Sequence, residues 1–371
     1  MSIRVAQWAT GAVGKTILRG IIDRPDLELV ALRVYGDRKV GRDAGDIARR
    51  PPTGVLATTD IAAVIAARPD VVVHSPRLQV PYETHDADLV RLLSAGINVV
   101  TTAGQHFPRA HGPERSDLFE DACRRGNSTL FGVGISPGVV GERLALALTG
   151  ASVTLDRITI DEVLDARSMP DPDFMFTVMG MGSDPASLDG TGPLPTLYGL
   201  LYRETIAFLC DRLGVVPDDI VPDHRIVPAL TDLTVAAGSI AAGTVGTTEW
   251  RWHALVDGKP FLTLAIIWTC EPDRPEYAGR DHWRIHLEGK PEMVLTLNLV
   301  EPSEPGVRTT AAQYVTAGPA LRAIEHVVAA PPGVFTAPVF GPWNASRSPR
   351  VAPGAAATAA AAAAASAEVA R

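Results

Sequence analysis

Short apolar runs alternate with helical patterns along the first 140 residues of the chain. The apolar runs are residues 3–9, 27–35, 70–74, 97–102 and 129–133. Runs that are apolar at consecutive positions are typical of strands covered on both faces. The pattern therefore predicts an α/β fold that begins with a doubly wound parallel sheet.

The middle of the chain follows a two-residue period instead. The segments that alternate apolar and polar residues are 153–163, 250–256, 261–270, 282–287 and 292–300. Asp257-Gly258 and Glu288-Gly289 are typical of the hairpin turns between such strands. We expect an α+β domain built on an open, mostly antiparallel sheet, with one helix at 197–213. A last helix at 309–328 is expected to return to the first domain.

Composition excludes several classes of protein. The 371 residues, 46% of them hydrophobic, suffice for two domains. The net charge of -8, without a basic run, predicts no nucleic-acid partner. The three cysteines, Cys123, Cys210 and Cys270, form neither a disulfide framework nor a metal pattern. No signal peptide or membrane span is evident, so we expect a cytoplasmic protein.

A glycine turn joins the first strand to the first helix. Its residues run Ala9, Thr10, Gly11, Ala12, Val13 and Gly14. Gly11 would let the backbone approach a pyrophosphate, and Gly14 would let the helix pack closely on the strand. Ala9 replaces the first glycine of the usual triplet, which is tolerable if its φ is negative and awkward otherwise. A tight turn without a ligand is the alternative, but the position at the start of a βαβ chain favours a dinucleotide site.

The end of the second strand indicates which dinucleotide would bind. A carboxylate at this strand tip would bind the ribose hydroxyls of NAD(H), whereas Tyr35 stands there. Arg38 and Lys39 can pair with a 2′-phosphate, so the sequence favours NADP(H). NAD(H) stays open through Asp37, and solvated loop charges are the alternative for this segment.

Candidate chemistry follows the strands at the carboxyl edge of the sheet, where ligands bind in such folds. We expect one loop with His74 and Ser75, and a second with Thr101, Thr102 and Ala103, to contact the nicotinamide end. A third loop spans residues 134–138.

Three residues are candidates for catalysis. His106 is a candidate general acid or base, because imidazole titrates near neutral pH, and His111 is the runner-up. Either histidine could instead cap a loop. Glu162 could face the cleft and bind an amine or orient a hydroxyl, and a carboxylate on the sheet rim is its alternative. Gln105 precedes His106 and can hydrogen-bond a substrate.

Taken in order, five segments of the chain resemble the dihydrodipicolinate reductase-like oxidoreductases. They are WATGAVGKT, VYGDRKVGRDAGDI, DVVVHSP, INVVTTAGQ and GVGISPGVVGERL. Within that family the chain is similar to the branch of 2,4-diaminopentanoate dehydrogenase and the native amine dehydrogenases, over about residues 3–342. The resemblance implies a Rossmann domain, a substrate domain and a homodimer. It also implies NAD(P)H-dependent hydride transfer to or from a carbon bonded to nitrogen.

The resemblance assigns residues 11–14 to the phosphate turn, Arg38 and Lys39 to the adenosine-ribose loop, and residues 101–103 to the nicotinamide loop. Two departures bear on the reaction. No His-His and Lys cluster occurs in the second domain, so the lysine-biosynthesis reaction is not expected. The amine dehydrogenases keep a glutamate just after the nicotinamide-loop threonine, where Gly104-Gln105 stands here. Gln105 cannot take a proton, which affects ammonia activation more than reduction of a ketone or a preformed imine.

We therefore expect an NAD(P)H-dependent oxidoreductase that acts on a small carbonyl, imine or amine, with Gln105 or His106 polarising the substrate or relaying a proton. The missing glutamate motivates an alternative, a cofactor-binding sensor or regulatory protein without turnover. The expected boundaries are 1–140 for the NAD(P)-binding Rossmann domain and 141–305 for the α+β substrate and dimerisation domain. Residues 306–345 should hold the returning helix, and 346–371 a disordered alanine-rich tail.

Overall fold

Two β-sheets organise the fold in a computed structural model that describes residues 2–169, 171–277, 282–304 and 306–347. The strands of the first sheet are β1 (Ile3–Trp8), β2 (Leu27–Arg33), β3 (Ala57–Thr58), β4 (Val71–His74), β5 (Asn98–Thr101), β6 (Thr129–Gly132) and β15 (Gly333–Val334). They are all parallel and follow the order β15-β6-β5-β4-β1-β2-β3. The part β3-β2-β1-β4-β5-β6 is the Rossmann order, so the predicted doubly wound sheet is confirmed.

Helices cover both faces of this sheet. They are α1 (Ala12–Asp23), α2 (Ala44–Ala48), α3 (Ile61–Ala66), α4 (Asp86–Ser94), α5 (Pro113–Gly126) and α8 (Ala311–Ala329). On one face α1 and α8 pack side by side over β1, β4 and β5, and α4 and α5 cover the other face. The strands are apolar at consecutive positions because each residue meets one of these two helical layers.

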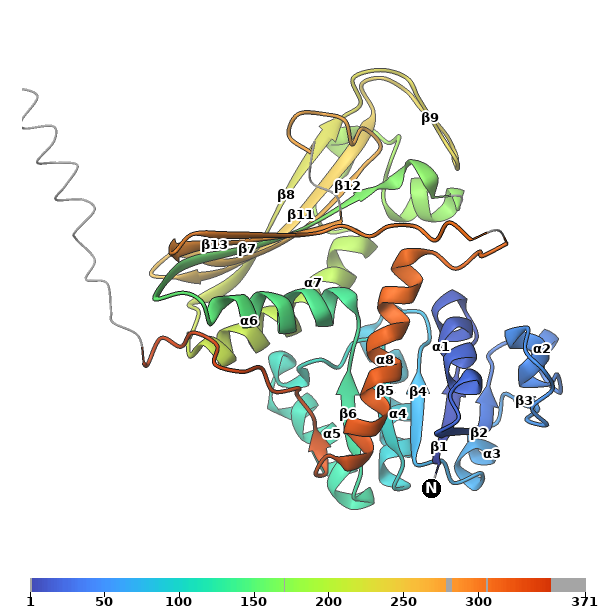
Figure 1. Cartoon of the computed structure of the whole chain (residues 1–371). Helices are drawn as coiled ribbons and strands as arrows, with labels where there is room; N and C mark the ends of the chain where they lie inside the picture. The colour runs from blue at the N-terminus through green and yellow to red at the C-terminus, as the bar shows by residue number, and fades with distance from the viewer. Residues whose placement is uncertain (1, 170, 278–281, 305, 348–371) are drawn as a thin grey trace, which may run out of the picture.

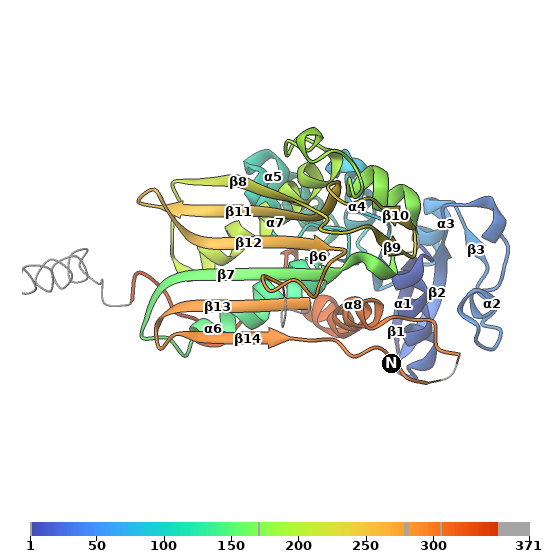
Figure 2. The same cartoon turned by 90° about the horizontal axis from the view of Figure 1, so that it is seen from above.

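The second sheet has six strands. They are β7 (Thr154–Asp165), β8 (Asp219–Pro228), β11 (Val245–Val256), β12 (Lys259–Thr269), β13 (His282–Lys290) and β14 (Met293–Leu297). Their order is β14-β13-β7-β12-β11-β8, as Figure 2 shows from above, and only the pair of β7 and β12 is parallel. Helices α6 (Leu146–Thr149) and α7 (Pro193–Leu213) lie between this sheet and the first domain in Figure 1. The expected open, mostly antiparallel sheet is confirmed.

The alternation pattern predicts no strand at β8, yet this strand pairs with β11 along nearly its whole length. It carries Pro222 and Pro228 and exposes most of its residues. Both features are compatible with an edge strand, where a missing N–H donor costs little. A small hairpin of β9 (Leu233–Val235) and β10 (Gly238–Ile240) follows it.

The C-terminal part of the chain returns to the first domain. Thr310 and Gln313 form a capping box at the start of α8. The side chain of Leu321 lies against Gly20 of α1, and β15 pairs with β6 at the edge of the sheet. Most of the expected alanine-rich tail, from residue 348 on, lies outside the described residues. Of the helices described here, none is both long enough and apolar enough to cross a bilayer.

Candidate functional site

The turn between β1 and α1 has a strained backbone that the surrounding residues stabilise. Ala9 has a φ of 73°, the left-handed region that favours glycine. Its N–H donates to the carbonyl oxygen of Arg33 at 2.9 Å, and its own carbonyl accepts from Nε2 of Gln7 at 2.9 Å. The same Gln7 nitrogen donates to Oγ of Ser75 at 2.8 Å. The φ of Ala9 is therefore positive, which is the unfavourable case for an alanine at this position, and these hydrogen bonds hold the residue there.

Two glycines in this turn have different roles. A Cβ on Gly14 would overlap with the carbonyl oxygen of Ala9 and lie 2.8 Å from Oγ of Ser75, so the helix packs on the strand only because the residue is glycine. A Cβ on Gly11 would meet no atom within 4 Å. Gly11 is the N-cap of α1 and provides no side-chain cap for the N–H groups of the first turn, which includes Ala12 and Val13.

An open groove of about 610 Å³ runs from this turn to the loop after β2. Among its lining residues are Thr10, Gly11, Tyr35, Arg38, Lys39, Ser75 and Arg77. Nζ of Lys39 donates to the carbonyl oxygen of Thr10 at 3.0 Å and to its hydroxyl at 2.8 Å. Partial burial and the nearby Lys15 and Arg42 lower the pKa of Lys39. The positive charge concentrated at this end of the groove suits a phosphate.

The tip of β2 is built from stacked side chains. The guanidinium of Arg33 lies 4.0 Å from the ring centroid of Trp8 and 4.7 Å from that of Tyr35. The indole N–H of Trp8 donates to the hydroxyl of Tyr35 at 2.9 Å. This bond leaves the tyrosine proton free to donate elsewhere. NAD-selective folds place a carboxylate at this position. Here it is occupied by the neutral hydroxyl of Tyr35, whose ring stacks on the guanidinium of Arg33.

The next two strand ends are joined through His74. Its ring is buried, and its Nδ1 lies 2.9 Å from the hydroxyl of Thr101, which accepts from the N–H of Ala103 at 3.0 Å. Burial, His85 and Arg33 lower the pKa of His74 well below its usual value, so the ring is neutral. His74 therefore supports the loop of residues 101–103, while Thr102 is partly exposed at the sheet edge.

The side chain of Gln105 points into the first domain. Gly104 and Gln105 both have positive φ values, and Nε2 of Gln105 donates to Asp86 at 3.2 Å. Asp86 is paired with Arg115 at 2.7 Å. Gln105 is 1% exposed, so its amide does not line an open surface. Its proposed contact with a substrate stays a prediction.

Glu204 on α7 holds the segment that follows Gln105. It is fully buried and accepts from the backbone N–H groups of His106 and Phe107 at 2.6 and 3.0 Å. Its other oxygen accepts from the hydroxyl of Tyr82 at 3.1 Å and lies 3.1 Å from Nε2 of His111. Burial opposes its charge, but these partners lower the pKa of Glu204 overall. The carboxylate thus fixes the segment of His106 and Phe107 in the first domain to α7 of the second.

The ring of His106 pairs with a second glutamate. Its Nδ1 lies 3.0 Å from Glu142, whose other oxygen accepts from Thr205 at 3.0 Å. Burial disfavours the charged ring, yet Glu142 and Glu204 raise the pKa of His106 overall. The imidazole is thus occupied by a buried partner, and its predicted role as acid or base is not tested by this geometry.

Glu162 interrupts an apolar face. On β7 it follows Ile158 and Ile160 at two-residue spacing, and its neighbours across the sheet are Trp283 and Ile266. Oε2 of Glu162 accepts from the indole N–H of Trp283 at 2.9 Å and from the hydroxyl of Tyr202 at 3.3 Å. Burial raises the pKa of Glu162, although the residue keeps part of its surface accessible. A carboxylate of raised pKa on a partly exposed residue between two domains is a candidate for a functional site.

Ser136 connects this carboxylate to the first domain. It belongs to the loop after β6, and its hydroxyl lies 3.4 Å from that of Tyr202. Ser136 also hydrogen-bonds Glu162, and this bond lowers the pKa of Glu162 and so offsets part of the increase caused by burial. Because β5 and β6 are neighbours, this loop ends at the same sheet edge as the nicotinamide loop. Glu162 of the second domain therefore lies beside the carboxyl edge of the Rossmann sheet, the edge from which Gln105 and His106 follow β5.

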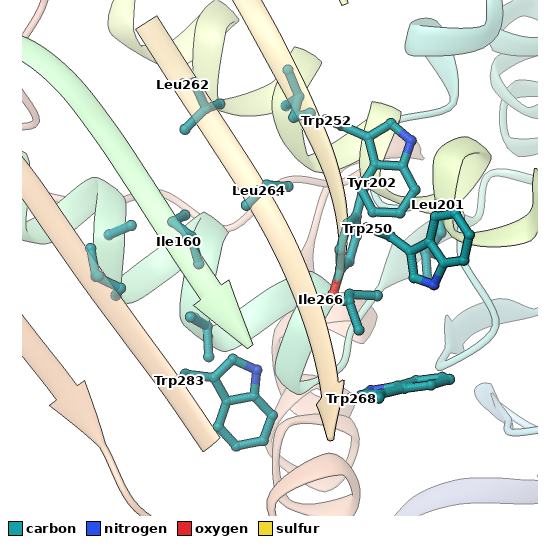
Figure 3. Packing of buried hydrophobic residues seen from close by; sticks show 14 of the residues in the cluster. Ile160, Leu201, Tyr202, Trp250, Trp252, Leu262, Leu264, Ile266, Trp268 and Trp283 are labelled. Carbon is teal, nitrogen blue, oxygen red and sulfur yellow. The ribbon is translucent and has the colours of Figure 1, made fainter. Parts of the chain in front are cut away.

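Aromatic rings surround the end of the second sheet where Glu162 lies. Tyr198 lies edge-on to Tyr202 and to Trp268, with ring centroids 5.9 and 5.7 Å apart, and Phe174 lies 5.8 Å from Trp268. Figure 3 shows Trp268 and Trp283 at the same end of the sheet, with the hydroxyl of Tyr202 directed toward that end. Tyr198 and Tyr202 of α7 thus form one wall of an aromatic region around a carboxylate.

The chain is similar to proteins of known activity. A scan against models of protein families gives no match. An amine dehydrogenase from Streptomyces virginiae is 31% identical over 347 residues, which cover 90% of this chain and 95% of that protein. The chain belongs to the amine dehydrogenase family. A 70-residue segment, 19% of this chain and 26% of the relative, is 39% identical to a 4-hydroxy-tetrahydrodipicolinate reductase from Moorella thermoacetica.

The fold agrees with this membership. An amine dehydrogenase structure from Mycobacterium smegmatis superposes with a TM-score of 0.68 at 21% identity, covering 91% of this chain and 95% of that one. The chain is an NAD(P)-dependent oxidoreductase, uses a nicotinamide cofactor and acts on a small molecule. The predicted resemblance is confirmed, and nothing in these comparisons supports the sensor alternative.

The residues present fit a dinucleotide. The uncapped N-terminus of α1, the space above Gly11 and the cations near Lys39 form a cradle for a pyrophosphate. Of the predicted cofactor residues, Thr10, Gly11, Arg38, Lys39 and Ser75 line one groove. The others lie in the first turn of α1 or at the ends of β4 and β5.

Proposed function

We propose that this member of the amine dehydrogenase family interconverts a small apolar ketone and its amine with NADP(H). The observation that carries the proposal is Glu162, a deep but accessible carboxylate ringed by aromatic side chains at the carboxyl edge of the Rossmann sheet. In the described part of the chain, the donors that reach it are neutral: Tyr202, Trp283 and Ser136. A buried carboxylate without a cation is costly, and an ammonium or iminium substrate would supply that cation.

The surroundings of Glu162 favour an apolar carbon skeleton. Tyr198, Phe174 and Trp268 give a wall of ring faces and edges, which contact hydrocarbon and also attract cations. A carboxylate on the substrate would instead be repelled by Glu162. We therefore expect ketones and amines without an acidic group to be preferred.

The cofactor proposal is NADP(H) rather than NAD(H). Support comes from the tip of β2, where Tyr35 takes the place of a carboxylate, and from exposed Arg38 beside Lys39. A 2′-phosphate carries about two negative charges, so it gains most from a guanidinium and an ammonium at this end of the groove. Asp37, exposed in the same loop, is the residue that would favour NAD(H) instead.

The roles of the residues follow from their places. The first turn of α1 would hold the pyrophosphate, and residues 101–103 would hold the nicotinamide ring. The cofactor supplies or accepts the hydride when it is bound. Glu204 keeps the nicotinamide loop in place, and the aromatic wall excludes water from the substrate.

The test uses the full chain and the absorbance of reduced nicotinamide. NADPH oxidation is measured with cyclohexanone, with and without ammonium, and with the preformed imine 2-methyl-1-pyrroline. We expect ammonium-dependent oxidation with the ketone, and faster turnover with NADPH than with NADH. Tight NADPH binding with no oxidation in any of these mixtures would contradict the proposed reaction.

The family resemblance also leads us to propose a homodimer. Multi-angle light scattering of the purified chain would give twice the mass of 39.3 kDa if this holds. A single-chain mass at micromolar concentration would exclude it.

A further inference from the structure

The resemblance to the native amine dehydrogenases implies a glutamate just after the nicotinamide-loop threonine, and this chain has no carboxylate there. The positions after the nicotinamide-loop threonines are Gly104 and Gln105, and the Gln105 amide donates to Asp86 in the first domain. An amide cannot accept a proton from ammonium, which is fully protonated at neutral pH. If the enzyme uses ammonia, another group must therefore take that proton.

Three carboxylates of the second domain lie near the domain boundary, and their burial and partners differ. Glu204 is buried, whereas Glu142 and Glu162 are partly exposed. Glu204 is fully buried and already accepts from two backbone N–H groups and a tyrosine hydroxyl. One oxygen of Glu142 lies 3.0 Å from Nδ1 of His106, and the other accepts from the hydroxyl of Thr205. Glu162 alone of the three combines a raised pKa with neutral donors and an accessible surface.

We infer that Glu162 replaces the missing nicotinamide-loop carboxylate as the catalytic base that activates ammonia, supplied by the second domain instead of the first. Trp283 and Tyr202 both donate to Oε2, at 2.9 and 3.3 Å, and Ser136 also hydrogen-bonds the carboxylate. We assign Oε1 to the substrate nitrogen. This inference deepens the proposed function and rests on it.

The proton balance is complete with ammonium as the named co-reactant. The Glu162 carboxylate takes one proton from ammonium, and the lone pair of the resulting ammonia forms a C–N bond with the carbonyl carbon. One proton then moves from the added nitrogen to the former carbonyl oxygen, which gives the neutral carbinolamine. The protonated carboxyl returns its own proton to the hydroxyl of the carbinolamine, which leaves as water and gives the iminium ion. This return restores the carboxylate, whose charge stabilises the iminium cation. One hydride then reduces the iminium carbon to the amine, while NADPH is oxidised to NADP⁺.

Tyr202 and Trp283 act as positioning residues in this arrangement. Their donors hold Oε2 and so fix the rotamer of Glu162, and the bond between Tyr202 and Ser136 ties it to the loop after β6. The base is therefore placed against the nicotinamide edge only when the two domains are docked. A carboxylate supplied by the second domain can take up the proton of ammonium in the same way. The loop of the first domain then needs no acid and can hold Gly104 and Gln105, both of which have positive φ values.

The decisive variant is Glu162→Gln, which keeps the size of the side chain and an acceptor for Tyr202 and Trp283. We expect kcat/KM for ammonium with cyclohexanone to fall about 100-fold or more, because general base catalysis is lost. Reduction of 2-methyl-1-pyrroline needs no ammonia and should fall less than about tenfold. By titration calorimetry in the presence of NADP⁺, the Kd of cyclohexylammonium should rise about tenfold or more, because the anionic partner of its charge is gone. The Kd of NADPH should not change.

Asp161→Asn is the matched control, because Asp161 is the preceding residue of the same strand and points to the opposite face of the sheet. We expect it to leave the ammonium-dependent rate within about threefold of wild type. Should Glu162→Gln fail to fold, Tyr202→Phe decides, since it removes one donor from Oε2 and should lower the same ratio of ammonium to imine activity.

The possible outcomes distinguish a failure of the role assigned to Glu162 from a failure of the proposed reaction. If the wild-type chain oxidises NADPH with none of the probes, the proposed function and this inference both fail. If the wild type is active and Glu162→Gln keeps its ammonium dependence and its affinity for cyclohexylammonium, the inference alone is overturned. An equal loss in Asp161→Asn and Glu162→Gln would also overturn it, because the effect would then belong to the strand.

Discussion

The amide nitrogen of Gln7 donates a hydrogen bond of 2.9 Å to the carbonyl oxygen of Ala9, two residues further along the same strand end. This bond holds Ala9 at a φ of 73°, where an alanine is strained. The turn that presents the helix N-terminus to the cofactor thus keeps its shape without the first glycine of the usual triplet.

Ala9→Gly should stabilise the protein. The left-handed conformation costs alanine about 1–2 kcal/mol, and the added flexibility of glycine in the unfolded chain offsets about half of that. We expect the free energy of unfolding in urea to rise by about 1 kcal/mol. Ala12→Gly, in the first turn of α1, is the control and should lower it by a similar amount. A loss of stability in Ala9→Gly would show that the turn is not strained.

Gly11→Ala should separate cofactor binding from folding. The added Cβ meets no protein atom within 4 Å and its φ of -67° suits alanine, so stability should not change. The methyl group would enter the space assigned to the pyrophosphate, and the Kd of NADPH should rise at least about tenfold. Gly14→Ala should instead destabilise the fold, because its Cβ overlaps with the Ala9 carbonyl. Unchanged NADPH affinity in Gly11→Ala, measured by tryptophan fluorescence, would place the cofactor elsewhere.

Arg38→Ala should change cofactor preference. Arg38 is exposed in the groove, and its loss removes one partner of the 2′-phosphate without disturbing the core. We expect the Kd of NADPH to rise about tenfold and that of NADH to change less than about twofold. Lys39→Met should weaken both cofactors, because Lys39 also bonds to Thr10 in the phosphate turn. If Arg38→Ala weakened the binding of NADPH and NADH equally, Arg38 would not be the cause of the preference for NADPH.

Glu204→Gln should weaken the junction between the domains. The backbone N–H groups of His106 and Phe107 both point to one oxygen of Glu204, while its other oxygen accepts from Tyr82. An amide nitrogen at the first position would face two N–H donors, and at the second it would remove the acceptor that Tyr82 uses. Either arrangement also loses the charge of the carboxylate, which should cost about 2–3 kcal/mol of unfolding free energy. Asp211→Asn, exposed on the same helix, should have no measurable effect. In the folded Glu204→Gln protein kcat should fall while the Kd of NADPH stays the same, because the affected loop holds the nicotinamide end.

His74 should make stability depend on pH. Its folded-state pKa lies well below 6.5, so the folded ring stays neutral while the unfolded chain takes up a proton as the pH falls below about 6.5. The wild type should therefore lose up to about 1.4 kcal/mol of unfolding free energy per pH unit from this group, and His74→Gln should lose that much less. His326→Gln, on an exposed position of α8, is the control. Parallel pH profiles for the wild type and His74→Gln would contradict the assignment of a buried neutral ring.

The sequence predicts the architecture well because period and turn chemistry act locally. The buried strands, the helix after Gly11 and the alternation of β7, β11 and β12 all follow from residues close in the chain. The strand β8 escapes prediction because Pro222 and Pro228 interrupt its pattern, and only its pairing with β11 at a sheet edge makes it a strand.

The site is less predictable because its contacts are long-range. Glu162 stands out in the sequence as an acid at the spacing of Ile158 and Ile160, which places it on the apolar face. The role of Glu204 has no local signal, since its partners Tyr82 and His106 lie about a hundred residues earlier in the chain. The polar Gln7 within an apolar strand was a usable signal, because a buried amide in such a strand must find partners.

The pairing of β15 with β6 and the packing of α8 on α1 have a consequence for synthesis. The nucleotide-binding domain is assembled from both ends of the polypeptide, so the ribosome must release residues beyond 334 before the sheet edge and the face beside α1 are covered. The second domain, whose strands are contiguous in the chain, can fold while those residues are still being made. A chain cut short after β14 would carry every residue assigned to chemistry and still lack the helix and strand that complete its cofactor domain.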